Sequence, residues 1–178
     1  NSEPHSLQHL DIKPQNIFLV HNHVKVADFG LAKDMGEKQA VTVTGGVTFD
    51  QIIENFHDQA AGLVAGGADV LLVETQQDTR NVKAALIGIW RLFDELGFKV
   101  PVMVSGTIEA MGTMLAGQTV EAFATSMMHA ELLSLGLNCA TGPEFMTDHV
   151  RSLAGLTENR VSCIPNAGLP NEDGIYLE

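Results

Sequence analysis

Four groups of polar or small residues each follow a short apolar run in the sequence. They are Glu74-Thr75, Ser105-Gly106-Thr107, Asn138-Cys139 and Pro165-Asn166. A carboxylate at the end of a buried strand costs free energy unless it meets a cation or hydrogen-bond donors. A cysteine thiolate is both a nucleophile and a metal ligand. Because the carboxyl ends of parallel strands carry the chemistry of α/β proteins, these groups predict a site built from several strand ends.

A different set of reactive residues lies near the start of the chain. The stretch HLDIKPQN, residues 9–16, is followed by Asp28-Phe29-Gly30. This order and spacing resemble the catalytic loop and metal-binding motif of Ser/Thr protein kinases. By that resemblance Asp11 would accept the proton of a substrate hydroxyl, and Asn16 and Asp28 would hold the magnesium of Mg-ATP.

The other parts of a kinase do not accompany this segment. The Gly-rich loop and the strand lysine that grip ATP belong upstream, where only residues 1–8 lie, and no Ala-Pro-Glu segment follows Lys33. We therefore expect residues of about 7–34 to be a kinase fragment without activity. Its apolar runs at 17–20 and 24–27, separated by His21-Asn22-His23, predict a β-hairpin. A change of texture at 34–48 divides the chain into segments 1–38 and 39–178.

The elements that must position the strand-end groups alternate between helix and strand. Apolar runs predict strands at 70–73, 100–104, 135–138 and 161–164. Helical spacing predicts helices from Thr48, which starts a capping box with Gln51, and over 79–96, 119–133 and 143–155. Strands that recur every ~30 residues with a helix between them indicate a parallel sheet, and their apolar character predicts that both faces are covered. Four units are too few for a closed eight-stranded barrel of about 250 residues, so half of a barrel or part of an open sheet is expected.

Five motifs of the longer segment together resemble a known enzyme family. They are GGADVLLVET, PVMVSGTI, GQTVEAF, LGLNCATGP and PNAGLP. In this order they are similar to the homocysteine-binding domain of cobalamin-dependent methionine synthase, and to the wider homocysteine S-methyltransferase family, over residues of about 45–178. The resemblance implies a partial (β/α)₈ TIM-type barrel, and methyl transfer from methylcobalamin to homocysteine, giving methionine.

The resemblance also assigns roles to the strand-end residues. Cys139 of the GLNC motif would be a zinc ligand, and the metal would activate the homocysteine thiol. Glu74 would bind the ammonium group of homocysteine. Ser105, Gly106 and Thr107 would line the same pocket, and Asn138 would orient neighbouring groups.

The zinc site implied by the family is incomplete in this sequence. The family uses two further cysteines as an adjacent pair, which is absent here, and Cys163 matches neither of them. We therefore expect an isolated chain that lacks the folate and cobalamin modules and is inactive. Two alternatives stay open: a kinase fragment that binds ATP and magnesium, or a non-functional fusion of two gene pieces.

Composition limits the partners and the compartment. The formal net charge of −12 disfavours nucleic acid and anionic membranes, which attract basic patches. Two cysteines form no disulfide framework, which indicates a reducing compartment. The first residues lack the pattern of a signal peptide, and no apolar stretch of about 18 residues occurs. A cytoplasmic protein is expected.

Overall fold

The computed structural model describes residues 7–8, 17–20, 23–26, 33–34 and 47–166, and it divides into two compact units, Asn1–Val47 and Thr48–Glu178. In the first unit β1 (Leu7–Gln8) pairs antiparallel with β4 (Lys33–Asp34), a pairing that the sequence did not predict. The predicted hairpin is confirmed: β2 (Ile17–Val20) pairs antiparallel with β3 (His23–Val26). His23 pairs with Val20, so it belongs to the strand and not to the turn. The kinase-like residues Asp11, Asn16 and Asp28 lie outside the described residues.

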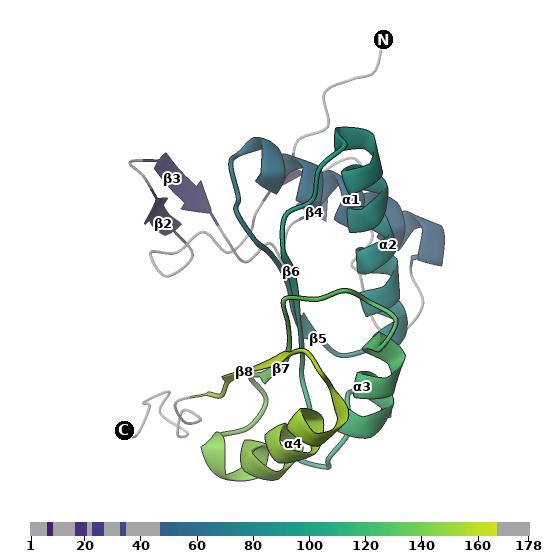
Figure 1. Cartoon of the computed structure of the whole chain (residues 1–178), viewed down its shortest axis with the longest axis vertical. Coiled ribbons are helices and arrows are strands. Elements are labelled where there is room, and N and C mark those ends of the chain that lie inside the picture. Colours follow the sequence, from purple (N-terminus) through teal and green to yellow (C-terminus); the bar gives the residue numbers. More distant parts are fainter. Residues whose placement is uncertain (1–6, 9–16, 21–22, 27–32, 35–46, 167–178) are drawn as a thin grey trace. The chain divides into compact units, whose positions relative to one another are not determined.

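The second unit is a regular alternation of helices and parallel strands (Figure 1). Its elements are α1 (Phe49–Ala65), β5 (Leu71–Gln76), α2 (Thr79–Leu96), β6 (Val102–Gly106), α3 (Val120–Met127), β7 (Ser134–Asn138), α4 (Pro143–Leu156) and β8 (Arg160–Ile164). The strands form one parallel sheet in the order β5-β6-β7-β8. The four helices lie along one side of this sheet, as in the wall of a barrel. The predicted α/β fold is confirmed.

Local capping explains where the helices begin. Thr48 and Gln51 form the predicted capping box at the start of α1, with both reciprocal hydrogen bonds present. The Asp78 carboxylate accepts a hydrogen bond from the Arg80 N–H at the start of α2. Pro143 is the first residue of α4, where a missing N–H has no cost. These caps fix where the chain leaves each strand and enters the next helix.

Several element boundaries differ from the prediction. β5 continues to Gln76, so Glu74 lies inside the strand, and the pairing with β6 is irregular between Val73 and Gln76. β6 begins two residues later than expected, after Pro101, which has no N–H to give to a ladder. α3 ends at Met127 instead of near Leu133, because the Leu133 N–H already donates to the Val102 carbonyl, 2.7 Å away.

The hydrophobic core lies between the sheet and the helices. Val73, Val104 and Leu135 occupy one row across the sheet, and all three pack in the core with side chains of α2 and α3. The expectation that every strand is covered on both faces is wrong for the two edge strands. β7 is buried along its whole length, whereas β5 alternates between buried and exposed residues and β8 is largely open. An edge strand has a neighbour on one side only, which explains the difference.

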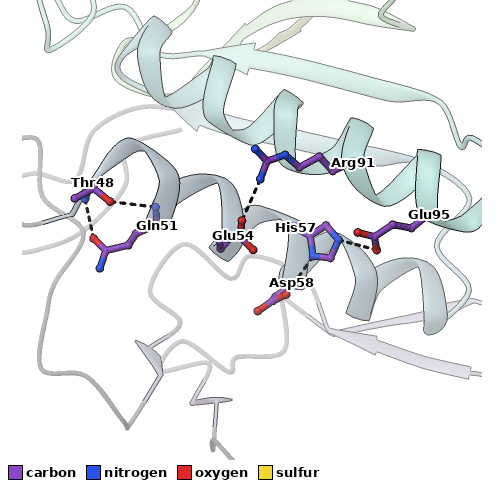
Figure 2. Close-up of polar contacts among 7 residues, drawn as sticks. All are labelled: Thr48, Gln51, Glu54, His57, Asp58, Arg91 and Glu95. Carbon is purple, nitrogen blue, oxygen red and sulfur yellow. Dashed lines mark hydrogen bonds and ion pairs between the residues drawn. The ribbon is translucent and has the colours of Figure 1, made fainter.

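Helices α1 and α2 pack closely because Gly88 faces the α1 backbone. A Cβ atom at Gly88 would lie 2.6 Å from the Ile53 carbonyl oxygen and 2.9 Å from the His57 nitrogen. Figure 2 shows the polar contacts beside this crossing: Arg91 donates to Glu54 at 3.0 Å, and His57 contacts Glu95 at 3.1 Å. The hydrogen bond from His57 to Asp58, supported by Glu95, raises the pKa of His57 above its usual value against the opposing effect of burial.

Candidate functional site

The side chain of Asn138 connects the carboxyl ends of three neighbouring strands. Asn138, the last residue of β7, is completely buried. Its Oδ1 accepts hydrogen bonds from the Ser105 hydroxyl at 2.6 Å and from the Thr75 N–H at 3.2 Å. Its Nδ2 donates to the Thr75 hydroxyl at 2.7 Å and to the Cys139 sulfur at 3.1 Å. Both amide hydrogens and both lone pairs of oxygen are therefore used.

The backbone is unusual at the same place. Thr75, Cys139 and Ala140 have φ angles of 56°, 56° and 54°, in the left-handed region that side chains rarely adopt. The side chains of Thr75 and Cys139 accept the two hydrogen bonds that the Asn138 amide nitrogen donates. Such conformations cost on the order of 1–3 kcal/mol each and are found preferentially at functional sites. The strained backbone and the hydrogen-bond network thus occur together at the carboxyl ends of the strands.

Backbone hydrogen bonds hold Cys139 in place at the end of β7. Its N–H donates to the Ile164 carbonyl of β8 at 3.0 Å, and its carbonyl accepts from the Thr141 N–H at 2.6 Å. The residue is half-buried.

Cys163 lies on the other face of the sheet. It pairs with Leu137, a core residue, and its sulfur contacts the Met146 sulfur of α4 at 3.3 Å. Asn138 pairs with Ile164, one residue further along, and therefore faces the opposite side. Cys163 therefore lies on the opposite face of the sheet from Asn138, and its lack of a ligand position stays a prediction.

The described residues do not complete a metal site. Within 47–166 and the short described strands, no three His, Cys, Asp or Glu side chains gather closely enough to hold a metal ion. A protein zinc site takes about three or four such ligands. Cys139 has the right donor chemistry, because a cysteine thiolate is a zinc ligand, but it offers one ligand only.

The proposed pocket-lining residues lie around this network in different environments. Glu74 is exposed on β5; it follows Val73, whose partner Val104 precedes Ser105. Ser105 is buried and bonded to Asn138. Thr107 is 2 % exposed, and its hydroxyl has no partner among the described residues. Such a buried hydroxyl is expected to have a partner, and a bound ligand could supply one.

Gly106 faces away from this network. It pairs with Leu137 on the helix-covered face, and a Cβ atom there would lie 3.0 Å from the Phe123 ring of α3. Close packing against that ring gives a reason for glycine at this position that is independent of any ligand. The role of Gly106 in lining a pocket stays a prediction.

Sequence reasoning did not single out Thr75 as a site residue. The residue appears in the strand-end group beside Glu74, but its left-handed φ and its pairing with Asn138 depend on the irregularity in β5. The sequence signal that could have identified Thr75 as a site residue was its position just after a predicted buried strand. The loop after β6 is fastened nearby, since the Thr107 N–H donates to the Gln76 carbonyl at 2.9 Å. A separate shallow groove, lined by Phe49, Thr79, Arg80 and Lys83, contains none of these site residues.

Two solved structures share the fold of this chain. They are the apo and metallated forms of the homocysteine methyltransferase MmuM from Escherichia coli, each with a TM-score of 0.53 and 22% sequence identity. Each match covers 65% of this chain, but only 44% of the apo and 40% of the metallated protein. The chain therefore spans less than half the length of these proteins. Neither structure is a kinase, and the comparisons lend the kinase-like segment no support.

A family comparison covers much more of the sequence. The family model of homocysteine S-methyltransferase matches residues 16–178, which begins upstream of the expected boundary near residue 45 and includes the hairpin β2–β3. The match spans well over half of the 178 residues. This chain belongs to the homocysteine S-methyltransferase family.

Proposed function

We propose that this chain supplies part of the homocysteine-binding site of a methyltransferase that converts homocysteine to methionine. The observation that carries the proposal is the Asn138 network, which holds the Cys139 sulfur beside the ends of β5 and β6. A saturated buried amide fixes the positions of several groups at once, which is what a binding site needs before its ligand arrives.

The substrate and the surrounding residues have complementary chemistry. The exposed Glu74 carboxylate provides negative charge for the ammonium group of an amino acid. The buried Thr107 hydroxyl offers a hydrogen bond to a polar group of the ligand. Cys139 follows β7, and Asn138 holds its sulfur in place. The thiol of the substrate would lie beside this sulfur.

Two further groups belong to the proposal through the family. Zinc would bind and activate the substrate thiol, with Cys139 as one ligand and its other donors from outside the described residues. Methylcobalamin would be the methyl donor, as the sequence resemblance to methionine synthase implies. The residues of this chain would bind and orient homocysteine.

A titration by isothermal calorimetry in the presence of zinc tests the proposal. We expect the chain to bind homocysteine in the millimolar range or tighter, and to bind homoserine, which has a hydroxyl in place of the thiol, at least tenfold more weakly. Glu74→Gln should weaken homocysteine binding about fivefold, a typical loss for a partly exposed charge pair. Glu54→Gln is the matched control, because Glu54 is an exposed carboxylate that contacts Arg91 away from this site.

Two results of this titration would count against the proposal. No binding of homocysteine at millimolar concentration would exclude the proposed function. Equal binding by the Glu74→Gln and Glu54→Gln variants would retain the function but remove Glu74 from it.

A further inference from the structure

The orientation of the Asn138 amide is determined by its surroundings. The Thr75 N–H can only donate a hydrogen bond, and it lies 3.2 Å from one end of the amide. That end must therefore be the oxygen, because two donors cannot pair. The nitrogen then faces the Cys139 sulfur at 3.1 Å, and the sulfur is necessarily the acceptor.

We infer that Asn138 is a positioning residue for the Cys139 sulfur, and that Thr75 and Ser105 hold the amide in the orientation this requires. The biological role of this arrangement rests on the proposed function, whereas the hydrogen bonds around Asn138 do not depend on it. The inference makes the expected orienting role of Asn138 specific to the Cys139 sulfur, and the completely buried side chain has no hydrogen-bonding capacity left for a substrate.

Thr75 has the most specific part in this arrangement. It contacts the amide twice, through its backbone N–H and through its hydroxyl, and its φ of 56° brings both groups to the same side chain. The Thr75 hydroxyl accepts a hydrogen bond from one N–H of the Asn138 amide. The other N–H of the amide is left to donate to the Cys139 sulfur. A valine at this position would keep the branched shape and the N–H and would lose the hydroxyl.

The arrangement also explains the left-handed backbone of Cys139. In a continued strand the next side chain would point to the opposite face from Asn138. The φ of 56° ends the strand and allows the sulfur to lie within hydrogen-bonding distance of the preceding side chain. An N–H that points at sulfur stabilises negative charge there, as outer hydrogen bonds do around a ligating group.

Nuclear magnetic resonance tests this assignment directly. In ¹⁵N-resolved spectra of the full chain, both side-chain amide protons of Asn138 should exchange slowly with water. The proton facing sulfur should change its chemical shift in Cys139→Ser, while the Cys163→Ser control leaves it unchanged. Rapid exchange of both protons, or no response to Cys139→Ser, would overturn the inference.

A chemical measurement tests the consequence for sulfur. In a Cys163→Ser background Cys139 is the single thiol, and its alkylation by iodoacetamide can be followed by mass spectrometry. We expect Asn138→Asp to slow alkylation about tenfold, because the variant replaces a charge-stabilising donor by a carboxylate. Thr75→Val should also slow the reaction, and Thr75→Ser should restore it. Rates within twofold of the parent in folded variants would overturn the inference.

The two proposals can fail separately. If homocysteine does not bind while the Asn138 proton responds to Cys139→Ser, the proposed function is wrong and the positioning role stands. If homocysteine binds and the Asn138 proton does not respond to Cys139→Ser, the proposed function stands and the positioning role is wrong. Should Asn138→Asp not fold, the spectra of the chain with native Asn138 still decide the matter.

Discussion

The close crossing of α1 and α2 makes a quantitative prediction about Gly88. The two helices precede and follow β5 in the chain, and β5 is the strand that ends in the Thr75 region of the site. In Gly88→Ala the new methyl carbon would lie 2.6 Å from the Ile53 carbonyl oxygen and 2.9 Å from the His57 nitrogen. Ordinary non-bonded contacts are about 3.5 Å. Both neighbours are backbone atoms, so the helices must move apart by several tenths of an ångström.

The expected loss of stability follows from two opposing effects. Overpacking costs about 1–3 kcal/mol, and two backbone contacts place this case near the upper end. Alanine gains about 1 kcal/mol over glycine inside a helix. The net loss in the free energy of unfolding is then about 2 kcal/mol. Gly62→Ala is the matched control on α1, because a Cβ atom there meets nothing within 4 Å, and it should gain about 1 kcal/mol.

Thermal unfolding followed by circular dichroism measures both variants. For a chain of this length, 1 kcal/mol corresponds to about 2–4 °C in Tm. Gly88→Ala should lower Tm by about 4–8 °C, and Gly62→Ala should raise it by about 2–4 °C. A Gly88→Ala variant as stable as Gly62→Ala would refute the close crossing of the two helices.

Three further predictions concern the same unit. Thr48→Ala removes the capping hydrogen bond of α1 and should lower the free energy of unfolding by about 1 kcal/mol in urea titrations; an unchanged midpoint would contradict the cap. Because the pKa of His57 is raised, its contribution is complete below the usual pKa and is lost as pH rises through the folded value. The free energy of unfolding in urea titrations should therefore fall more between about pH 6 and about pH 8 in the parent than in His57→Gln, by less than about 1 kcal/mol; equal falls would contradict the contacts of His57 with Asp58 and Glu95 in Figure 2. The exposed edge residue Ile164 predicts concentration-dependent association in size-exclusion chromatography, reduced by Ile164→Lys; a monomer at every concentration would contradict it.

The sequence predicted the bounds of an element well where clear capping residues mark both of its ends. Helix α2 runs from Thr79 to Leu96 as expected, because Asp78 caps its start and Gly97, with a φ of 72°, ends it. The strand order follows from the regular alternation with helices. The end of α3 was missed, because apolar residues continue at helical spacing beyond Met127 while the backbone of Met128 and Ala130 forms turns and the Leu133 N–H already donates to the Val102 carbonyl of the sheet.

The site was predictable in its location but not in its internal arrangement. Parallel strands bring their carboxyl ends to one edge, so the grouping of Ser105 with Asn138 and Cys139 follows from topology. The contacts of Thr75 do not, because they depend on an irregular register and a left-handed residue in β5. Exposure of the edge strands was also missed, since apolar composition alone does not reveal how many neighbours a strand has.

The central claim is that homocysteine binds at the carboxyl ends of β5, β6 and β7. A homocysteine titration of the ¹⁵N-labelled chain, followed by its amide resonances, tests this claim most directly. We predict saturable shift changes concentrated at Thr75, Ser105, Thr107 and Cys139, with the α1–α2 crossing unaffected. Shift changes confined to other parts of the chain, or none up to millimolar homocysteine, would contradict the claim.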